Sequence, residues 1–247
     1  MAFTSNPDKF ILLAIVAFSS RIAHQLEQGI EVMDVYLNKA HFPVTVLGPG
    51  KRIGLWLQGC SLRCLGCVSM DTWDRDDSHK ISVELLLDWC KSVSADGLDG
   101  VTISGGEPFE QPEALLVLLQ GLTDWRNSLS QPFDILCYSG LPCSVLENNF
   151  ANLLGFMDAI IPEPFLEDRP ADGPWRGSDN QPLLVLSEFG KSRDWQMTDS
   201  PGGRHMQFVT DDERIWFIGV PRPGDMERLR GRLLEQGIEL SSCSWKA

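Results

Sequence analysis

The sequence predicts an α/β protein, because short apolar runs that suit β-strands alternate along the chain with amphipathic stretches that suit helices. Such alternation is typical of parallel strands whose connecting helices cover the sheet. The composition agrees, since 43% of the 247 residues are hydrophobic and 22% are charged, enough apolar material for one sizeable core. After this α/β part, a C-terminal extension is expected to add a small ββα unit.

Six apolar runs predict the strands of the main sheet. Five of them have a glycine, proline or charged residue on at least one side, and the sixth begins with a proline, as strand ends commonly do. In chain order the six strands are expected at residues 44–47, 53–57, 100–104, 133–138, 157–161 and 182–186.

Three stretches between these runs carry apolar residues at helical spacing. The first begins after Ser82, a suitable N-cap, and continues to Val93. The others cover residues 112–122 and 144–154. From 162 to 180 the chain is rich in Pro, Asp, Gly and Arg, which predicts a long functional loop.

The chain divides into three expected segments. These are an N-terminal extension (1–33), a core domain (34–190) and a C-terminal extension (191–247). The last boundary is placed at a polar, poorly periodic stretch. The C-terminal extension holds the ββα unit, with strands at 206–210 and 214–220 and a helix that Asp225 caps and that continues through Gln236.

The N-terminal extension contains an apolar stretch from Phe10 to Phe18. Its nine residues are too few to cross a bilayer, which takes about 20, and no small-residue cleavage site follows it. We interpret Met33 as an alternative start, so that residues 1–32 need not be native.

The charge and the cysteines limit the partners and the compartment. Thirty-four acidic against 21 basic side chains give a net charge of -13, which would repel a phosphate backbone, so nucleic acid is not an expected partner. Seven cysteines, three of them within eight residues, fit ligation better than disulfide bridging. The expected setting is a reducing cytoplasm, with no membrane partner.

Cys60, Cys64 and Cys67 form a C-x3-C-x2-C motif directly after an expected strand. An electron-transfer cubane takes four cysteines, so a three-cysteine site leaves one iron of a [4Fe-4S] cluster open to a ligand. The alternative is a structural Cys3His zinc site with His79 or His41 as the fourth ligand.

A second motif, Gly105, Gly106, Glu107 and Pro108, ends the strand expected at 100–104. Paired glycines let backbone groups approach a ligand closely, as at the carboxyl ends of parallel strands in other α/β folds. Taken alone, the same residues also suit an ordinary turn.

Together the two motifs resemble the radical SAM superfamily, named for S-adenosylmethionine (SAM). Further motifs resemble its glycyl-radical-enzyme activases, and in particular the branch that activates anaerobic ribonucleotide reductase. They are Gly-Pro-Gly-Lys-Arg at 48–52, Leu-Trp-Leu-Gln-Gly-Cys at 55–60, Asp-Thr-Trp-Asp at 71–74, Tyr-Ser-Gly at 138–140 and Trp-Arg-Gly-Ser-Asp-Asn-Gln at 175–181.

The resemblance implies a partial (β/α) barrel that uses a [4Fe-4S] cluster and SAM, is reduced by a flavodoxin or ferredoxin, and makes a 5′-deoxyadenosyl radical. In activases this radical takes a hydrogen atom from a glycine of a partner protein. By resemblance Cys60, Cys64 and Cys67 hold the cluster, while residues 105–108 hold the methionine end of SAM. Tyr138 and Ser139 would approach its ribose or adenine, although Tyr138 also suits simple strand packing.

Two further sets of residues carry weaker expectations. Lys51, Arg52 and Arg63 would form a basic patch near the cysteine loop that attracts an acidic flavodoxin. The remaining cysteines lack ligand spacing and are expected to pack as small apolar residues. They are Cys90, Cys137, Cys143 and Cys243.

Departures from the family pattern leave the substrate open. Pro-Glu-Pro-Phe at 162–165 replaces a segment that usually carries Asp-Gly before the Phe, and residues 191–247 have no counterpart in compact activases. Three functions therefore remain: a glycyl-radical activase, a radical SAM enzyme that modifies a peptide or small molecule directly, and a zinc-stabilised binding protein.

Overall fold

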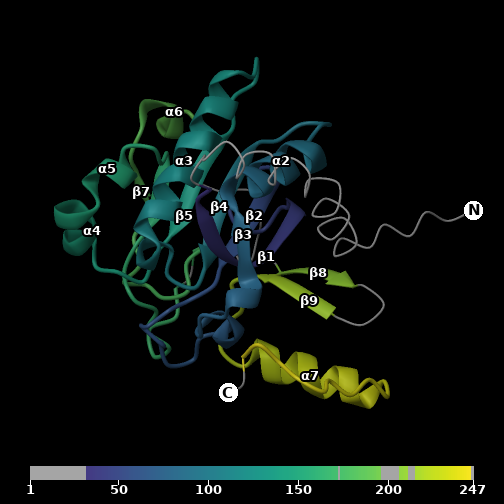
Figure 1. Ribbon diagram of the computed structural model, residues 1–247. Coiled ribbons are helices and arrows are strands. Elements are labelled where there is room, and N and C mark those ends of the chain that lie inside the picture. The colour runs from purple at the N-terminus through teal and green to yellow at the C-terminus, as the bar shows by residue number, and fades with distance from the viewer. Residues whose placement is uncertain (1–31, 172, 196–205, 211–214, 246–247) are drawn as a thin grey trace, which may run out of the picture.

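The computed structural model describes residues 32–171, 173–195, 206–210 and 215–245. The N-terminal extension expected at 1–33 and its apolar stretch lie almost entirely outside these ranges. Figure 1 shows one large sheet with helices α2 and α3 on the same side of it, and a separate β8–β9 hairpin with helix α7 near the C-terminus.

The large sheet contains seven strands in the order β3-β1-β2-β4-β5-β6-β7. Strands β2, β4, β5 and β6 run parallel, whereas β1, β3 and β7 pair antiparallel at the two sides. The bounds are β1 Asp34–Val44, β2 Arg52–Leu57, β3 Lys80–Ser82, β4 Gly100–Gly105, β5 Asp134–Tyr138, β6 Ala159–Ile161 and β7 Leu184–Val185.

The helices follow the expected alternation. They are α2 Val83–Val93, α3 Pro112–Asn127, α4 Cys143–Asn149, α5 Ala151–Leu154, α6 Glu188–Lys191 and α7 Asp225–Glu235. Single 3-10 turns cover Met70–Thr72, Asp77–His79 and Pro108–Glu110. The α/β class is therefore confirmed, and the seven-stranded sheet does not close on itself within the described residues.

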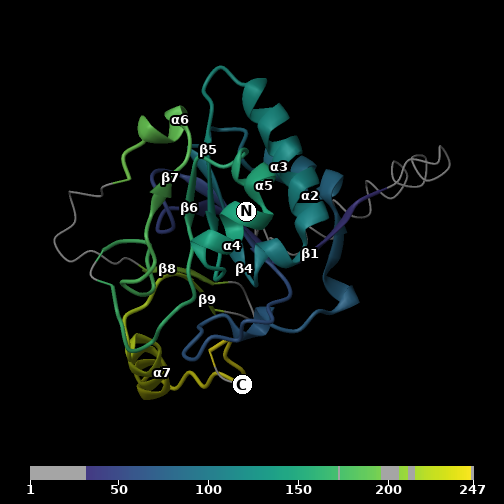
Figure 2. The same ribbon diagram turned by 90° about the vertical axis from the view of Figure 1, so that its left-hand side faces the viewer.

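Strand β5 shows how the sheet separates two apolar layers. Ile135 and Cys137 belong to the main core with α2 and α3, while Leu136 and Tyr138 pack on the opposite side against Trp175. Successive side chains of a strand point to opposite faces, so this alternation follows from the strand itself. Figure 2 shows the same arrangement, with α2 and α3 beside one face of the sheet.

Three sequence expectations were wrong in detail. The first strand is β1, which ends at Val44, and not a run at 44–47, because its polar Asn38, Lys39 and His41 hide the pattern. The helix expected at 144–154 is interrupted at Phe150. Helix α7 is preceded by Gly224 at φ 79°, so Gly224 and not Asp225 is its N-cap.

The expected ββα unit is present and packs on the end of β1. It consists of β8 Met206–Thr210, β9 Ile215–Gly219 and α7. Gln207 donates through Nε2 to the carbonyl of Pro43 (2.7 Å) and accepts from the amide of Thr45 (3.1 Å), while Ile218 joins the cluster around Trp56. Residues 196–205, which span most of the expected boundary, lie outside the described part of the chain.

In the part of the chain that the structure describes, no helix has the length and apolar character required to cross a membrane.

Candidate active site

The carboxyl ends of the parallel strands meet at one edge of the sheet and form a cavity of about 890 Å³. Strand β2 leads into the cysteine loop, β4 ends at Gly105 and β5 ends at Tyr138, and residues that follow each of these strands line the cavity. Ligands of open α/β sheets bind at this edge. A cavity of this size lies within the range of small-molecule sites, which is roughly 300–1,000 Å³.

The cysteine loop is held in place by backbone hydrogen bonds to the segment that follows it. The amide of Gly59 donates to Thr72 O (2.7 Å), and the amide of Cys60 donates to Trp73 O (2.8 Å). Gln58, which is buried, donates through Nε2 to the carbonyl of Asp71 (3.0 Å). The loop is therefore fixed at its root.

Cys60, Cys64 and Cys67 are free, half-buried thiols that all line the cavity. Burial raises the pKa of Cys60 and of Cys67. An iron–sulfur cluster requires thiolates, and bound metal supplies the positive charge that offsets their burial. The donor set and its placement therefore fit the three-cysteine cluster that the motif predicts.

A mononuclear metal site receives no support from this geometry. Among the described residues, no three His, Cys, Asp or Glu side chains are arranged to hold a single ion. A cubane binds one cysteine per iron, so the cysteine sulfurs bind different iron atoms and need not surround one point. Of the two expected fourth ligands, His79 lines the cavity, whereas His41 packs edge-on against Trp216 with the ring centroids 6.2 Å apart.

Gly105 and Gly106 allow β4 to lie directly against the root of the cysteine loop. A Cβ atom on Gly106 would lie 2.1 Å from the carbonyl oxygen of Gly59, and one on Gly105 would lie 2.4 Å from the amide of Leu57. Gly105 also has a φ of 103°, which only glycine adopts without strain. These glycines are thus required by packing.

The expectation that the glycine pair frees its amides for a ligand was wrong at Gly106, and the amide of the next residue, Glu107, is also engaged. The amide of Gly106 donates to Leu57 O and the amide of Glu107 donates to Gly59 O, each at 2.8 Å. A ligand at this strand end therefore meets acceptors, including the carboxylate of Glu107. Pro108 is buried beneath, at the start of the 3-10 turn.

Glu107 connects the ends of β4 and β5. Its side chain accepts from Ser139 Oγ (2.9 Å) and from the amides of Gly140 (2.7 Å) and Phe109 (3.1 Å). Burial nevertheless raises the pKa of Glu107 to about 7. Ser139 is thus held by Glu107, and both line the cavity.

Tyr138 is placed differently from Ser139. Its hydroxyl oxygen is buried and has no hydrogen-bond partner, and burial raises the pKa of the phenol. The ring packs between Trp175 and the cluster that contains Ile218, while the residue also lines the cavity. Both the packing and the ligand interpretation of Tyr138 are therefore compatible with its position.

The sequence analysis missed two groups that build the site. Gln111 donates through Nε2 to Gln58 O (3.0 Å) and accepts from the amide of Tyr36 (2.8 Å), which ties α3 to the cysteine loop. The second group is the C-terminal extension, whose residues 215–221 and 238–245 line the cavity. For the Gln111 contacts, the only signal in the sequence was the Gln-Gly-Cys motif at 58–60. No sequence pattern indicated that the C-terminal extension lines the cavity.

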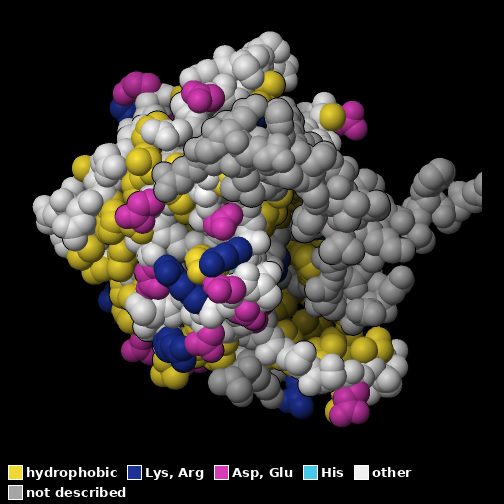
Figure 3. All heavy atoms as spheres, in the orientation of Figure 1, with side chains coloured by type: hydrophobic (Ala, Val, Ile, Leu, Met, Phe, Trp, Pro, Cys, Tyr) yellow, Lys and Arg dark blue, Asp and Glu magenta, His cyan; other side chains and the backbone are white. Residues whose placement is uncertain are grey.

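The expected basic patch near the cysteine loop was wrong. Arg52 is fully buried and pairs with Asp134, and Lys51 precedes β2, at the opposite end of that strand from the loop. Arg63 is in the loop but pairs with Asp74. Figure 3 shows acidic and basic side chains interspersed on the face in view.

The four other cysteines divide into two pairs. Cys90 and Cys137 are buried in the main core, as expected, and burial raises the pKa of both thiols. Cys143 is half-buried at the start of α4, and Cys243 is half-buried and lines the cavity, so neither belongs to a core cluster.

Comparison with known proteins matches residues 46–184 to the family described as the 4Fe-4S single cluster domain. The anaerobic ribonucleoside-triphosphate reductase-activating protein of Vibrio cholerae is 29% identical over 149 residues, covering 57% of this chain and 92% of that protein. The protein of the same name from Enterobacteria phage T4 is 27% identical over 138 residues, covering 56% and 86%. The pyruvate formate-lyase 1-activating enzyme of Escherichia coli is 42% identical over 73 residues, covering 28% and 29%.

Proposed function

The chain belongs to the 4Fe-4S single cluster domain family, and on that premise we propose that it is a radical SAM enzyme that activates a glycyl-radical protein. The matched relatives are activating proteins of this kind by name, which confirms the branch that the sequence resembles. The observation that carries the proposal is one cavity lined by all three motif cysteines and by the ends of β4 and β5.

In this proposal each strand end has a separate role. Cys60, Cys64 and Cys67 hold three irons of a [4Fe-4S] cluster, which leaves the fourth iron open to SAM. When bound, the cluster would supply the one-electron reduction that splits SAM into methionine and the 5′-deoxyadenosyl radical, which abstracts hydrogen. A flavodoxin or ferredoxin supplies that electron.

The acceptors at the end of β4 suit the amino group of SAM. The amides of Gly106 and Glu107 already donate hydrogen bonds to β2 and its loop, so the groups left for a ligand at this strand end are oxygen acceptors. An ammonium group can donate hydrogen bonds to such acceptors. The Glu107 carboxylate, clamped by Ser139 and Gly140, adds negative charge there once it is ionised. Gly105 contributes the close approach between the strands.

Anaerobic reconstitution tests the proposal. We expect about four irons and four sulfides per chain, and 5′-deoxyadenosine when the reduced protein receives SAM. Cys60→Ser, Cys64→Ser and Cys67→Ser should each lower iron content and abolish cleavage. Cys143→Ser is the matched control, because Cys143 lies outside the cavity lining, and it should keep both.

One tightly bound zinc without SAM cleavage would overturn this reading in favour of a zinc-stabilised binding protein. If SAM is cleaved, incubation with the glycyl-radical protein encoded nearest the gene should produce a glycyl radical, visible by electron paramagnetic resonance. Cleavage without that signal would favour direct modification of a peptide or small molecule.

A further inference from the structure

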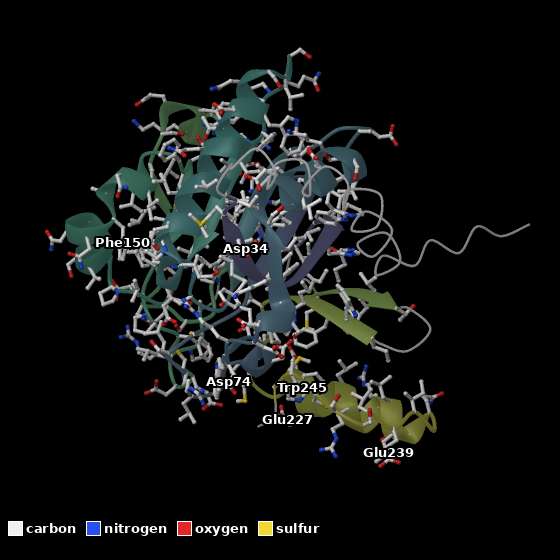
Figure 4. All side chains as sticks on the ribbon, in the orientation of Figure 1. Asp34, Asp74, Phe150, Glu227, Glu239 and Trp245 are labelled. Carbon is white, nitrogen blue, oxygen red and sulfur yellow. The ribbon has the colours of Figure 1, made fainter. Side chains whose placement is uncertain are left out.

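The C-terminal residues 238–245 form a wall of the cavity that contains the motif cysteines. This wall is attached on both sides. The amide of Met70 donates to Ser244 O (2.7 Å), and Ser244 Oγ donates to Val68 O (2.9 Å), just beyond the last cysteine. On the other side, the Trp245 ring packs edge-on against Phe217 of β9, with centroids 5.4 Å apart. Figure 4 shows Trp245 between the loop of Asp74 and helix α7.

Several residues that line the cavity carry a buried polar atom that has no hydrogen-bond partner. Among the described residues five buried side-chain atoms lack one, and three of these belong to residues that line the cavity: His79 Nδ1, Tyr138 Oη and Trp245 Nε1. Buried polar groups are nearly always paired, so an unpaired group in a cavity indicates a ligand that the structure lacks.

Trp245 differs from His79 and Tyr138 in the part of the chain to which it belongs. His79 and Tyr138 belong to the core domain, whose strand ends the proposed function assigns to the cluster and SAM. Trp245 belongs to the C-terminal extension and lines the cavity beside Phe217 of β9. Its indole N–H is a donor only, so its ligand must offer an acceptor atom.

The charges that line the cavity select a neutral acceptor. Its ionisable carboxyl groups belong to Asp71, Glu107 and Glu239, against one lysine, Lys39. A phosphate or an acidic side chain, unlike the zwitterionic methionine end of SAM, would add net negative charge to this excess of acid in a chain of net charge -13. A peptide carbonyl is an acceptor without charge.

The C-terminal extension also contributes apolar side chains to the cavity, and these suit the side chains of such a peptide. Phe217, Val220, Pro221, Ile238 and Leu240 all line the cavity. A cavity of about 890 Å³ lies near the upper end of the range for small-molecule sites, roughly 300–1,000 Å³, and is too small for a folded domain, so a protein substrate would have to enter as an extended segment.

We propose that the C-terminal extension forms the binding site for the substrate, and that Trp245 is a specificity-determining residue that donates its N–H to a backbone carbonyl of an extended, glycine-containing peptide segment. The inference rests on the proposed function, in which hydrogen is taken from a glycine. The 5′-deoxyadenosyl radical gains the hydrogen atom to become 5′-deoxyadenosine, and the glycine retains the unpaired electron.

The test uses the reconstituted full chain and a neutral pentapeptide, acetyl-Ala-Ala-Gly-Ala-Ala-amide, whose glycine carries two deuterium atoms on its α carbon. Deuterium found in 5′-deoxyadenosine reports hydrogen abstraction, whereas total 5′-deoxyadenosine formed without peptide reports SAM cleavage alone. In Trp245→Phe the ring contact with Phe217 remains while the N–H is lost. We expect its KM for the peptide to rise about 3- to 10-fold, the effect of one neutral hydrogen bond. SAM cleavage without peptide should stay within about twofold, since the change does not touch the cysteine loop.

Trp195→Phe is the matched control. Its indole N–H donates to Gly190 O (2.7 Å), away from the cavity lining, so this variant should keep the peptide KM. A chain shortened after Ser244 removes the ring as well and should raise the KM at least as much as Trp245→Phe does.

The outcomes separate this inference from the proposed function. No 5′-deoxyadenosine from the wild-type chain would overturn the proposed function. Cleavage without deuterium transfer, an unchanged KM in both Trp245 variants, or an equal loss of SAM cleavage and peptide reaction would overturn the role of Trp245 alone.

Discussion

The two edges of the parallel strands treat buried polar groups in opposite ways. At the amino edge, Arg52 and Asp134 are both fully buried, yet Arg52 donates to Thr102 Oγ1 (2.7 Å), to the carbonyls of Pro49 and Val101 (3.0 Å each) and to Asp134 (2.6 Å). Arg193 adds a second guanidinium to Asp134 at 2.9 Å. At the carboxyl edge, the hydroxyl of Tyr138 has no partner, and Glu107 keeps a raised pKa despite three donors.

This difference shows how a structural charge can be told from a functional one. A buried ion pair whose hydrogen bonds are complete supports the fold and offers nothing to a ligand. Groups that stay unpaired or have perturbed pKa values in a cavity point to a binding site. The predictions below test this comparison in order of decreasing effect.

The largest effect should come from Asp134→Ala at the amino edge. It leaves the Arg52 guanidinium buried without its counter-charge, which commonly destabilises by about 3–5 kcal/mol. Chemical denaturation would measure the loss. Asp74→Ala is the control, because the Arg63–Asp74 pair is exposed and should contribute less than about 1 kcal/mol. Equal effects of the two variants would contradict the comparison.

The next effect should be a pH dependence from Glu107 at the carboxyl edge. Its pKa rises from 4.5 to about 7 on folding, so between these values the folded chain holds a proton that the unfolded chain has released. The stability that this group contributes is therefore present below pH 4.5 and is lost as the pH rises through 7, by about 3 kcal/mol in all.

Glu107→Gln should remove this dependence of stability on pH, measured as the change of melting temperature of the cluster-free protein between pH 5 and 8. Glu84→Gln, an exposed change at the start of α2, serves as the control and should leave the slope intact. A wild-type slope that persists in Glu107→Gln would show that another group titrates.

A smaller loss of stability, but a large loss of iron, is expected for Gly106→Ala. The added Cβ would lie 2.1 Å from Gly59 O, so the root of the cysteine loop must shift, at about 1–3 kcal/mol. Iron analysis after reconstitution measures the displacement. Gly231→Ala in α7 has no atom within 4 Å of the new methyl group and should stabilise by about 0.5–1 kcal/mol. Full iron in Gly106→Ala would argue against the packing role.

The smallest effect should come from Arg193→Ala at the amino edge. Arg193 is partly exposed, and Asp134 keeps Arg52 when it is removed, so we expect a loss of about 1 kcal/mol. Denaturation of this variant beside Asp134→Ala would show how unequally the two guanidinium groups support the same carboxylate. A loss as large as that of Asp134→Ala would mean that Arg193 holds this edge together.

Much of the fold could be predicted because its signals are local. Ser82 was expected as an N-cap and accepts from the amide of Leu85, three residues away. The first strand could not be found, since β1 is half-exposed and its polar residues break the alternation.

The parts of the site that depend on local sequence could be predicted as well. The cysteine spacing and the glycine pair are short motifs, and both lie at strand ends as expected. That the amides of Gly106 and Glu107 serve the fold could not be seen, because their partners are almost fifty residues earlier.

The sequence by itself therefore determined the α/β class, the cysteine motif and the family resemblance, all of which depend on residues close together in the chain. Only the tertiary structure decided that Arg52 is buried at the edge away from the cysteines, and that Trp245, near the end of the chain, lines the same cavity as they do. The physical reason is that both placements depend on partners far away in sequence. Asp134 is 82 residues from Arg52, and Val68 is 176 residues from Ser244, and no local pattern encodes such pairs.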